Sequence, residues 1–151
     1  MSLTNAAENS GLLHWFNNTA FANFGDASGL PASAGAGTAS LSLSNVTGLA
    51  ETDSNPTTNE GTYTGYTRQT VARSGSGWTV SGTAPTQAAN AALIQFGNMT
   101  AGGPVTEAYV GLSFHPSGTR LDIFQALTSN LVVNNGVNPQ FAIGALVITL
   151  D

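Results

Sequence analysis

The chain has 151 residues, no cysteine and no lysine, and a formal net charge of -5 at pH 7, with only 7% of its residues charged. An average soluble domain carries about 25% charged residues, so amides and hydroxyls must replace ions at this surface. The negative balance disfavours nucleic acids and anionic membranes as partners, because both are bound through clustered Lys and Arg. Without cysteine the chain has no disulfide, thiolate metal site or Cys nucleophile. No apolar run approaches the ~20 residues of a membrane-spanning helix and the N-terminus lacks a secretory pattern, so we expect a soluble protein.

The first segment, residues 5–24, shows helical periodicity. Its apolar residues recur at three- and four-residue spacing: Leu12, Leu13, Trp15, Phe16, Ala20, Phe21 and Phe24. Asn5 and Glu8 have the spacing of a capping box, and Gly25 is a typical helix stop. We therefore predict an amphipathic helix that forms an N-terminal arm, residues 1–25, on a β domain of residues 26–151, the two making one structural domain.

The rest of the chain has the pattern of a β protein. Residues 26–37 resemble a linker, and in residues 38–46 Leu41 and Leu43 alternate with serines, as in a strand. Short β-branched and aromatic runs then alternate with turn residues at 63–72, 77–81, 92–97, 105–114, 119–127, 131–133 and 141–150. Alternation in the fourth run indicates one buried face, and the last run, apolar on both faces, indicates a central strand. We predict a mainly β fold: an antiparallel β-sandwich or jelly-roll-like barrel with an N-terminal helix.

Candidate catalytic residues are few. His14 and His115 are the only histidines, and a hydrolase would require His115 to meet Asp122 and a serine. No G-x-S-x-G motif places a nucleophile on a strained turn. A packed position for His14 and a turn position for His115 are the simpler interpretations, so we predict that the protein is not an enzyme and uses no cofactor.

Candidate cation ligands gather in one acidic loop. Glu51, Asp53 and Glu60 surround Pro56, and their carboxylates could hold a calcium ion. Their spacing matches no EF-hand, so a solvated loop is the preferred interpretation and no metal site is predicted.

Two of the three cationic side chains, Arg68 and Arg73, flank one short run. On a regular strand they have opposite parity, so they need not form one site. Arginine can hold a carboxylate in a two-pronged hydrogen bond, and the acids outnumber the arginines by eight to three. We expect pairing within the chain or between subunits rather than with an anionic ligand.

Three stretches carry a resemblance to a known family: "LTNAAENSGLLHWFNNTAFANFGDASGL", "TTNEGTYTGYTRQTVARSGSGWTVSGT" and "NNGVNPQFAIGALVITLD". Together they resemble small virion proteins of tailed bacteriophages, which are described as tail-fibre, minor structural or capsid decoration (cement) proteins. The resemblance covers most of the chain and carries over no catalytic residue.

The resemblance implies a structural role in the virion. The first hypothesis is a decoration protein, assembled in the host cytoplasm, that binds the outer capsid surface as a homotrimer and bridges major capsid protein subunits. The alternative is a tail-fibre or baseplate module that recognises the host surface through loops 52–61 and 115–119. Partner contacts are predicted at the helix face of Leu12, Trp15, Phe16 and Phe21 and at Arg68 and Arg73.

Overall fold

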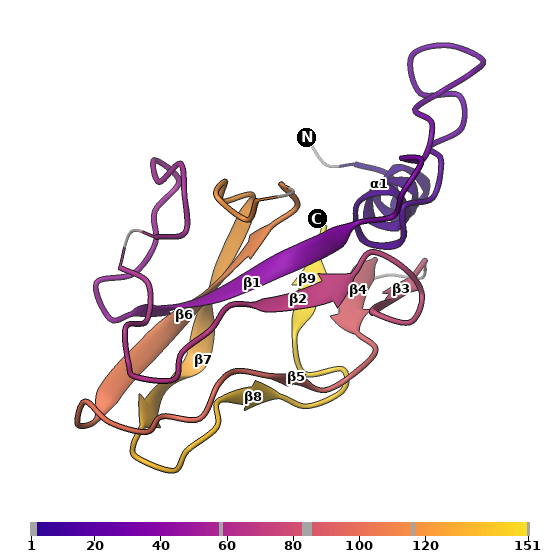
Figure 1. Cartoon of the computed structure of the whole chain (residues 1–151). Coiled ribbons are helices and arrows are strands. Elements are labelled where there is room, and N and C mark those ends of the chain that lie inside the picture. Colours follow the sequence, from indigo (N-terminus) through magenta and orange to yellow (C-terminus); the bar gives the residue numbers. More distant parts are fainter. Residues whose placement is uncertain (1–2, 58, 83–85, 116, 151) are drawn as a thin grey trace. The chain divides into compact units, whose positions relative to one another are not determined.

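The computed structural model describes residues 3–57, 59–82, 86–115 and 117–150. The chain is mainly β, with antiparallel sheets and one N-terminal helix, which confirms the predicted fold class (Figure 1). Its contacts divide it into two compact units. Unit 1 comprises Met1–Thr38, Ala72–Ile94 and Phe141–Asp151, and unit 2 comprises Ala39–Val71 and Gln95–Gln140. Among the described residues, no helix is both long and apolar enough to cross a bilayer.

The helix of unit 1, α1 (Asn5–Asn17), is shorter than predicted. Its N-cap is Thr4, one residue before the expected Asn5, and the Thr4 hydroxyl accepts a hydrogen bond from the Ala7 N–H. The prediction of a helix to residue 24 was wrong, because Asn18 adopts a left-handed conformation with φ of 53° and ends the helix. The side chain of Asn18 then donates to and accepts from the backbone of Ser33, which holds the following loop.

The buried face of α1 packs against β3 (Trp78–Ser81) and β4 (Gln87–Asn90). These strands form an antiparallel sheet in the order β3-β4-β9, with β9 spanning Val147–Thr149. Leu12 and Phe16 are fully buried, and the Phe16 ring meets the Trp78 ring edge-on with centroids 4.7 Å apart. Unit 1 therefore has a helix-on-sheet core, and the helix is part of it.

The C-terminal run does not form the expected central strand. β9 is short and lies at the edge of its sheet. The buried Asn90 side chain of β4 contacts the segment that leads into β9: it donates to the carbonyl of Ala142 and accepts from the Leu146 N–H. It also donates to the carbonyl of Ala92. Gly144, with φ of 74°, makes the turn that these bonds hold. An amide from another strand thus fixes this segment as a turn, which its apolar sequence did not reveal.

Most of the largest sheet lies in unit 2, with the strand order β2 (Gln69–Ala72), β1 (Thr38–Asn45), β6 (Val105–Ser113) and β7 (Ile123–Val133). Alternate residues such as Leu41 and Leu43 are buried as predicted, but Ser42 between them and Ser44 after them are buried too. A further strand pair, β5 (Ile94–Gln95) with β8 (Gln140–Phe141), completes the described strands. The sheets are open, so the sandwich-like form of the prediction holds, whereas a closed barrel does not.

A β-bulge interrupts β6 at Ala108. On the β1 side, Ser44 opposes Tyr109 and Asn45 opposes Glu107, so Ala108 is an extra residue. On the β7 side the pairing also shifts between Glu107 and Tyr109. A bulge reverses the facing of the side chains beyond it and often re-aims one of them. Here it directly follows the one strongly buried acid of this sheet, Glu107.

Candidate functional site

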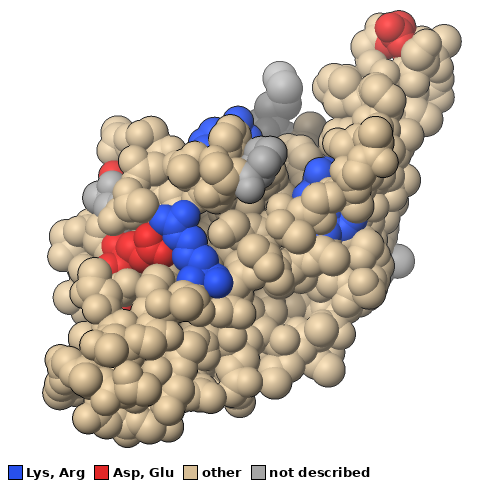
Figure 2. Space-filling model, in the orientation of Figure 1, with Lys and Arg blue, Asp and Glu red and all other residues tan. Residues whose placement is uncertain are grey.

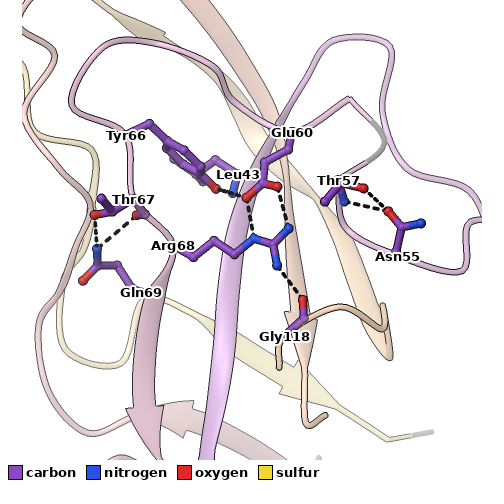
Figure 3. Close-up of polar contacts among 9 residues, drawn as sticks. All are labelled: Leu43, Asn55, Thr57, Glu60, Tyr66, Thr67, Arg68, Gln69 and Gly118. Atoms are coloured by element: carbon purple, nitrogen blue, oxygen red, sulfur yellow. Dashed lines mark hydrogen bonds and ion pairs between the residues drawn. The ribbon is translucent and has the colours of Figure 1, made fainter. Parts of the chain in front are cut away.

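The most tightly connected polar group of unit 2 is the ion pair of Arg68 with Glu60 (Figure 3). Nε and Nη2 of Arg68 donate to the two carboxylate oxygens of Glu60, each over 2.6 Å. Nη1 donates to the carbonyl of Gly118 over 2.5 Å. This two-pronged geometry is the strongest form of an arginine–carboxylate contact. Arg68 therefore ties two loops of unit 2 to the start of β2.

Tyr66 extends this network into the sheet (Figure 3). Its hydroxyl donates to Glu60 over 2.8 Å and accepts from the Leu43 N–H of β1 over 3.0 Å. Burial is the main cause that raises the pKa of Tyr66, and the neighbouring negative charge of Glu60 adds to it. The hydrogen bonds to Glu60 raise the pKa of Arg68 as well. Both shifts of the pKa favour the protonated forms of Tyr66 and Arg68.

Gly118 is required by the turn that faces Arg68. Its φ is 64°, in the left-handed region, and a Cβ there would lie 2.9 Å from the Ser40 hydroxyl. The glycine lets the backbone approach close enough for its carbonyl to accept from Arg68. Sequence reasoning placed Arg68 in an ion pair but could not name this partner, fifty residues away.

Arg73 has a different role, in unit 1. Its guanidinium donates to the carbonyls of His14 and Trp15 in the last turn of α1, over 2.8 and 2.6 Å, and to Ala36 over 3.1 Å. A cation at this position satisfies free helix carbonyls and offsets the negative end of the helix dipole. Burial lowers the pKa of Arg73 below its ordinary value. The two arginines, which lie only five residues apart in the sequence, therefore make their contacts in separate units.

The pair that a hydrolase would require, His115 and Asp122, shares no hydrogen bond among those that the structure shows for the described residues. Asp122 accepts from the Phe114 N–H over 2.7 Å and pairs with Arg120, while the His115 ring lies 2.8 Å from the Ser117 hydroxyl. These contacts hold the loop after β6. Residue 116 of this loop, and residue 58 of the other predicted recognition loop, lie outside the described residues.

The four residues of the predicted helix contact face differ in how far they are buried. Leu12 and Phe16 belong to the core of unit 1, whereas Trp15 is 43% exposed. Phe21 is partly buried and lies beyond the end of α1, where its ring packs against Phe24 with centroids 4.8 Å apart. Of the four apolar residues proposed to meet a partner, only Trp15 and Phe21 are accessible in the chain.

The acidic loop does not form a metal cluster. Asp53 folds back to accept a hydrogen bond from the Ala50 N–H over 2.7 Å, and Glu60 turns to Arg68. Across the part of the chain that the structure describes, no three His, Cys, Asp or Glu side chains gather in a way that could hold a metal.

Glu107 is the acid that sequence reasoning missed. It is 1% exposed, and its Oε2 has no hydrogen-bond partner among the described residues. Backbone lies close to the carboxylate, since a Cβ on Gly61 would be 2.7 Å from Oε1. Burial, and then the negative charge of Glu60, raise the pKa of Glu107 to about 6. The simple alternation of residues 105–114 would have put Glu107 on the face of Tyr109, and the bulge at Ala108 breaks that parity.

Arg68→Met tests the central ion pair. The variant leaves Glu60 mostly buried, with 14% of its side chain exposed, and without its cation. We expect the free energy of unfolding to fall by about 2–3 kcal/mol, measured by urea titration. Arg120→Met is the matched control, because Arg120 is 62% exposed in its pair with Asp122 and should cost less than about 1 kcal/mol. Equal losses in the two variants would contradict the assignment.

Glu107→Gln tests the buried charge through pH. The pKa of Glu107 rises on folding from 4.5 to about 6, so ionisation destabilises the folded chain, and the cost grows as pH rises between these values. Glu60 and Tyr63 are the titratable neighbours that couple to it. In metal-free buffer at pH 8 the variant should be more stable by about 1–2 kcal/mol, with no difference at pH 4. Urea unfolding of both proteins from pH 4 to pH 8 measures this. A difference in the free energy of unfolding that did not change with pH would contradict ionisation of Glu107 as the cause.

Comparison with known proteins identifies the family. The chain matches the family model of podophage GP4 fiber I protein gp80 over residues 2–149, which is nearly its whole length. None of the curated proteins matches it. The resemblance to tailed-phage virion proteins is thereby confirmed. The chain belongs to the family of podophage GP4 fiber I protein gp80, a family of structural proteins of the tailed-phage virion.

Proposed function

We propose that the protein is a structural subunit of a phage fibre, held in place by contacts between identical copies and without catalytic activity of its own. The observation that carries this proposal is the match of residues 2–149 to a family named for a fibre protein. Capsid decoration, with the major capsid protein as partner and the outer head surface as location, was the first hypothesis from the sequence. The family name favours the fibre alternative instead.

The placement of charge supports a passive structural role. Arg68 and Arg120 are each bound to a carboxylate of the same chain, and Arg73 is bound to helix carbonyls. Figure 2 shows blue and red groups in small patches on a face that is otherwise uncharged. Anion-binding receptors present free cationic groups to their ligand. This chain instead uses its few cations to fix its own loops.

The edge strand β7 is the best candidate for contact between copies. It ends the four-stranded sheet, pairs with β6 alone among the described strands, and spans Ile123–Val133 without a charged residue or proline. Most of it is accessible, and Val132 is 51% exposed. Exposed edges of monomers are normally protected by lysine, proline or short length, because their free N–H and C=O groups pair with other strands. An uncharged strand of a second copy can approach this edge without repulsion.

Copy number and position on the purified virion test the proposed function. Mass spectrometry with the major capsid protein as internal standard should give on the order of tens of copies or fewer per particle, as symmetric tail appendages require. Immunogold labelling should place them on a fibre. Hundreds of copies on the head would overturn the fibre assignment in favour of capsid decoration, and absence from the particle would overturn both.

Val132→Lys tests the β7 contact. We expect the native chain to form a homo-oligomer, with three copies as implied by the resemblance, and the variant to dissociate at least tenfold more readily because a charged side chain on this edge would have to lose its water at each contact. Light scattering after size exclusion measures the mass. Thr70→Lys, exposed on β2 at the opposite edge of the same sheet, is the control and should stay oligomeric.

An oligomer that survives in Val132→Lys, with the unfolding midpoint of the variant unchanged, would exclude β7 as the contact. A monomeric native chain in solution would exclude self-association through this edge altogether.

A further inference from the structure

We propose that Glu107 and the cleft beside it form a binding site for a divalent cation that prefers oxygen ligands, with Ca²⁺ as the best match. The inference concerns unit 2 alone and does not depend on whether the protein acts in a fibre or on the head.

The cleft has a volume of about 430 Å³ and is walled by three short segments: residues 45–47 at the end of β1, residues 60–62, and residues 105–107 of β6. Six of its nine described lining residues carry side-chain oxygens: Asn45, Thr47, Glu60, Thr62, Thr106 and Glu107. None of the nine is Lys, Arg or His. A cavity lined in this way offers oxygen ligands to a cation and no cationic side chain to an anion.

The second observation is the state of Glu107 itself. The side chain is 99% removed from solvent, yet its Oε2 meets no hydrogen-bond donor among the described residues. An ionised carboxylate is costly to bury unless a positive charge or several donors compensate it. The chain has no lysine. Arg68 already forms an ion pair with Glu60, the acid next to Glu107. A cation from solution would supply the compensation that the described residues do not.

The donor chemistry selects the ion. Carboxylate, amide and hydroxyl oxygens suit Ca²⁺, whereas the absence of His from the cleft and of Cys from the chain disfavours Zn²⁺ and other soft metals. Ca²⁺ accepts irregular geometry with six to eight oxygens, including water, which fits a site at a β-bulge better than the strict octahedron of Mg²⁺. Of the two carboxylates, only Glu107 is uncommitted, since both oxygens of Glu60 accept from Arg68, and the Asn45 amide oxygen already accepts from the Thr47 N–H. Low ligand charge of this kind corresponds to a Kd of about 10⁻⁴–10⁻³ M.

A bound ion would join the three segments that wall the cleft. It would bind the folded unit and not the unfolded chain, so the thermal midpoint should rise with ion concentration. The acidic loop considered from sequence shares only Glu60 with this site. Glu51 and Asp53 do not line the cleft.

The test uses the full chain after EDTA treatment, titrated with CaCl₂ at constant ionic strength. Calorimetry should give saturable one-site binding with a Kd of about 10⁻⁴–10⁻³ M, and the thermal midpoint should rise over the same concentrations. Glu107→Gln should weaken binding at least tenfold. Glu51→Gln is the control, because it removes an exposed acid outside the cleft and should leave the Kd unchanged.

The outcomes are decisive because Glu107→Gln removes a buried charge and is expected to fold, which circular dichroism checks. A second variant, Thr62→Val, removes one hydroxyl from the cleft wall and should weaken binding severalfold. No saturable Ca²⁺ binding by the native chain, or equal binding by native and Glu107→Gln proteins, would overturn the site. Tighter binding of Mg²⁺ than of Ca²⁺ would overturn the choice of ion.

Discussion

The two-pronged contact of Arg68 with Glu60 is the interaction on which the polar interior of unit 2 depends. In a chain with three cationic side chains, a mostly buried carboxylate has few possible partners. The same pair positions the Tyr66 hydroxyl, which in turn satisfies the Leu43 N–H of β1, and it binds the carbonyl of Gly118. Loss of one partner therefore leaves several buried groups unsatisfied at once. Scarcity of charge leaves the mostly buried Glu60 with few alternative partners, so this pair matters to the fold, whereas the exposed pair of Arg120 with Asp122 contributes little.

Charge scarcity also explains why Arg73 and Glu107 behave so differently. Arg73 donates to helix carbonyls, which every helix end provides. A buried carboxylate needs N–H donors or a cation. Glu107 is buried next to the bulge at Ala108, and its Oε2 meets no hydrogen-bond donor among the described residues. The raised pKa of Glu107 is the measurable consequence.

Local sequence patterns predicted the parts of the fold that depend on local chemistry. The strand containing Leu41 and Leu43 follows the expected alternation, and the helix begins within one residue of the predicted cap. The patterns failed at two asparagines whose partners are distant in sequence. Asn18, which bonds to the backbone of Ser33, ends the helix early, and the Asn90 side chain turns the apolar C-terminal run. β4, with the sequence QAAN, has weak strand propensity and is a strand because β3 and β9 pair with both its edges.

The candidate site was predictable to the same degree. An arginine in an ion pair follows from composition, and Arg68 has that role, but the positions of its partners require the fold. Glu107 could not be found by counting alternate residues, because one extra residue in β6 reverses the parity on which such counting relies. For a structural protein of a virion the consequence is general. Residues proposed for assembly or ion binding are distinguished by a bulge, an edge strand or an unpaired buried atom, and by no sequence motif. They can be identified only when strand register and burial are known.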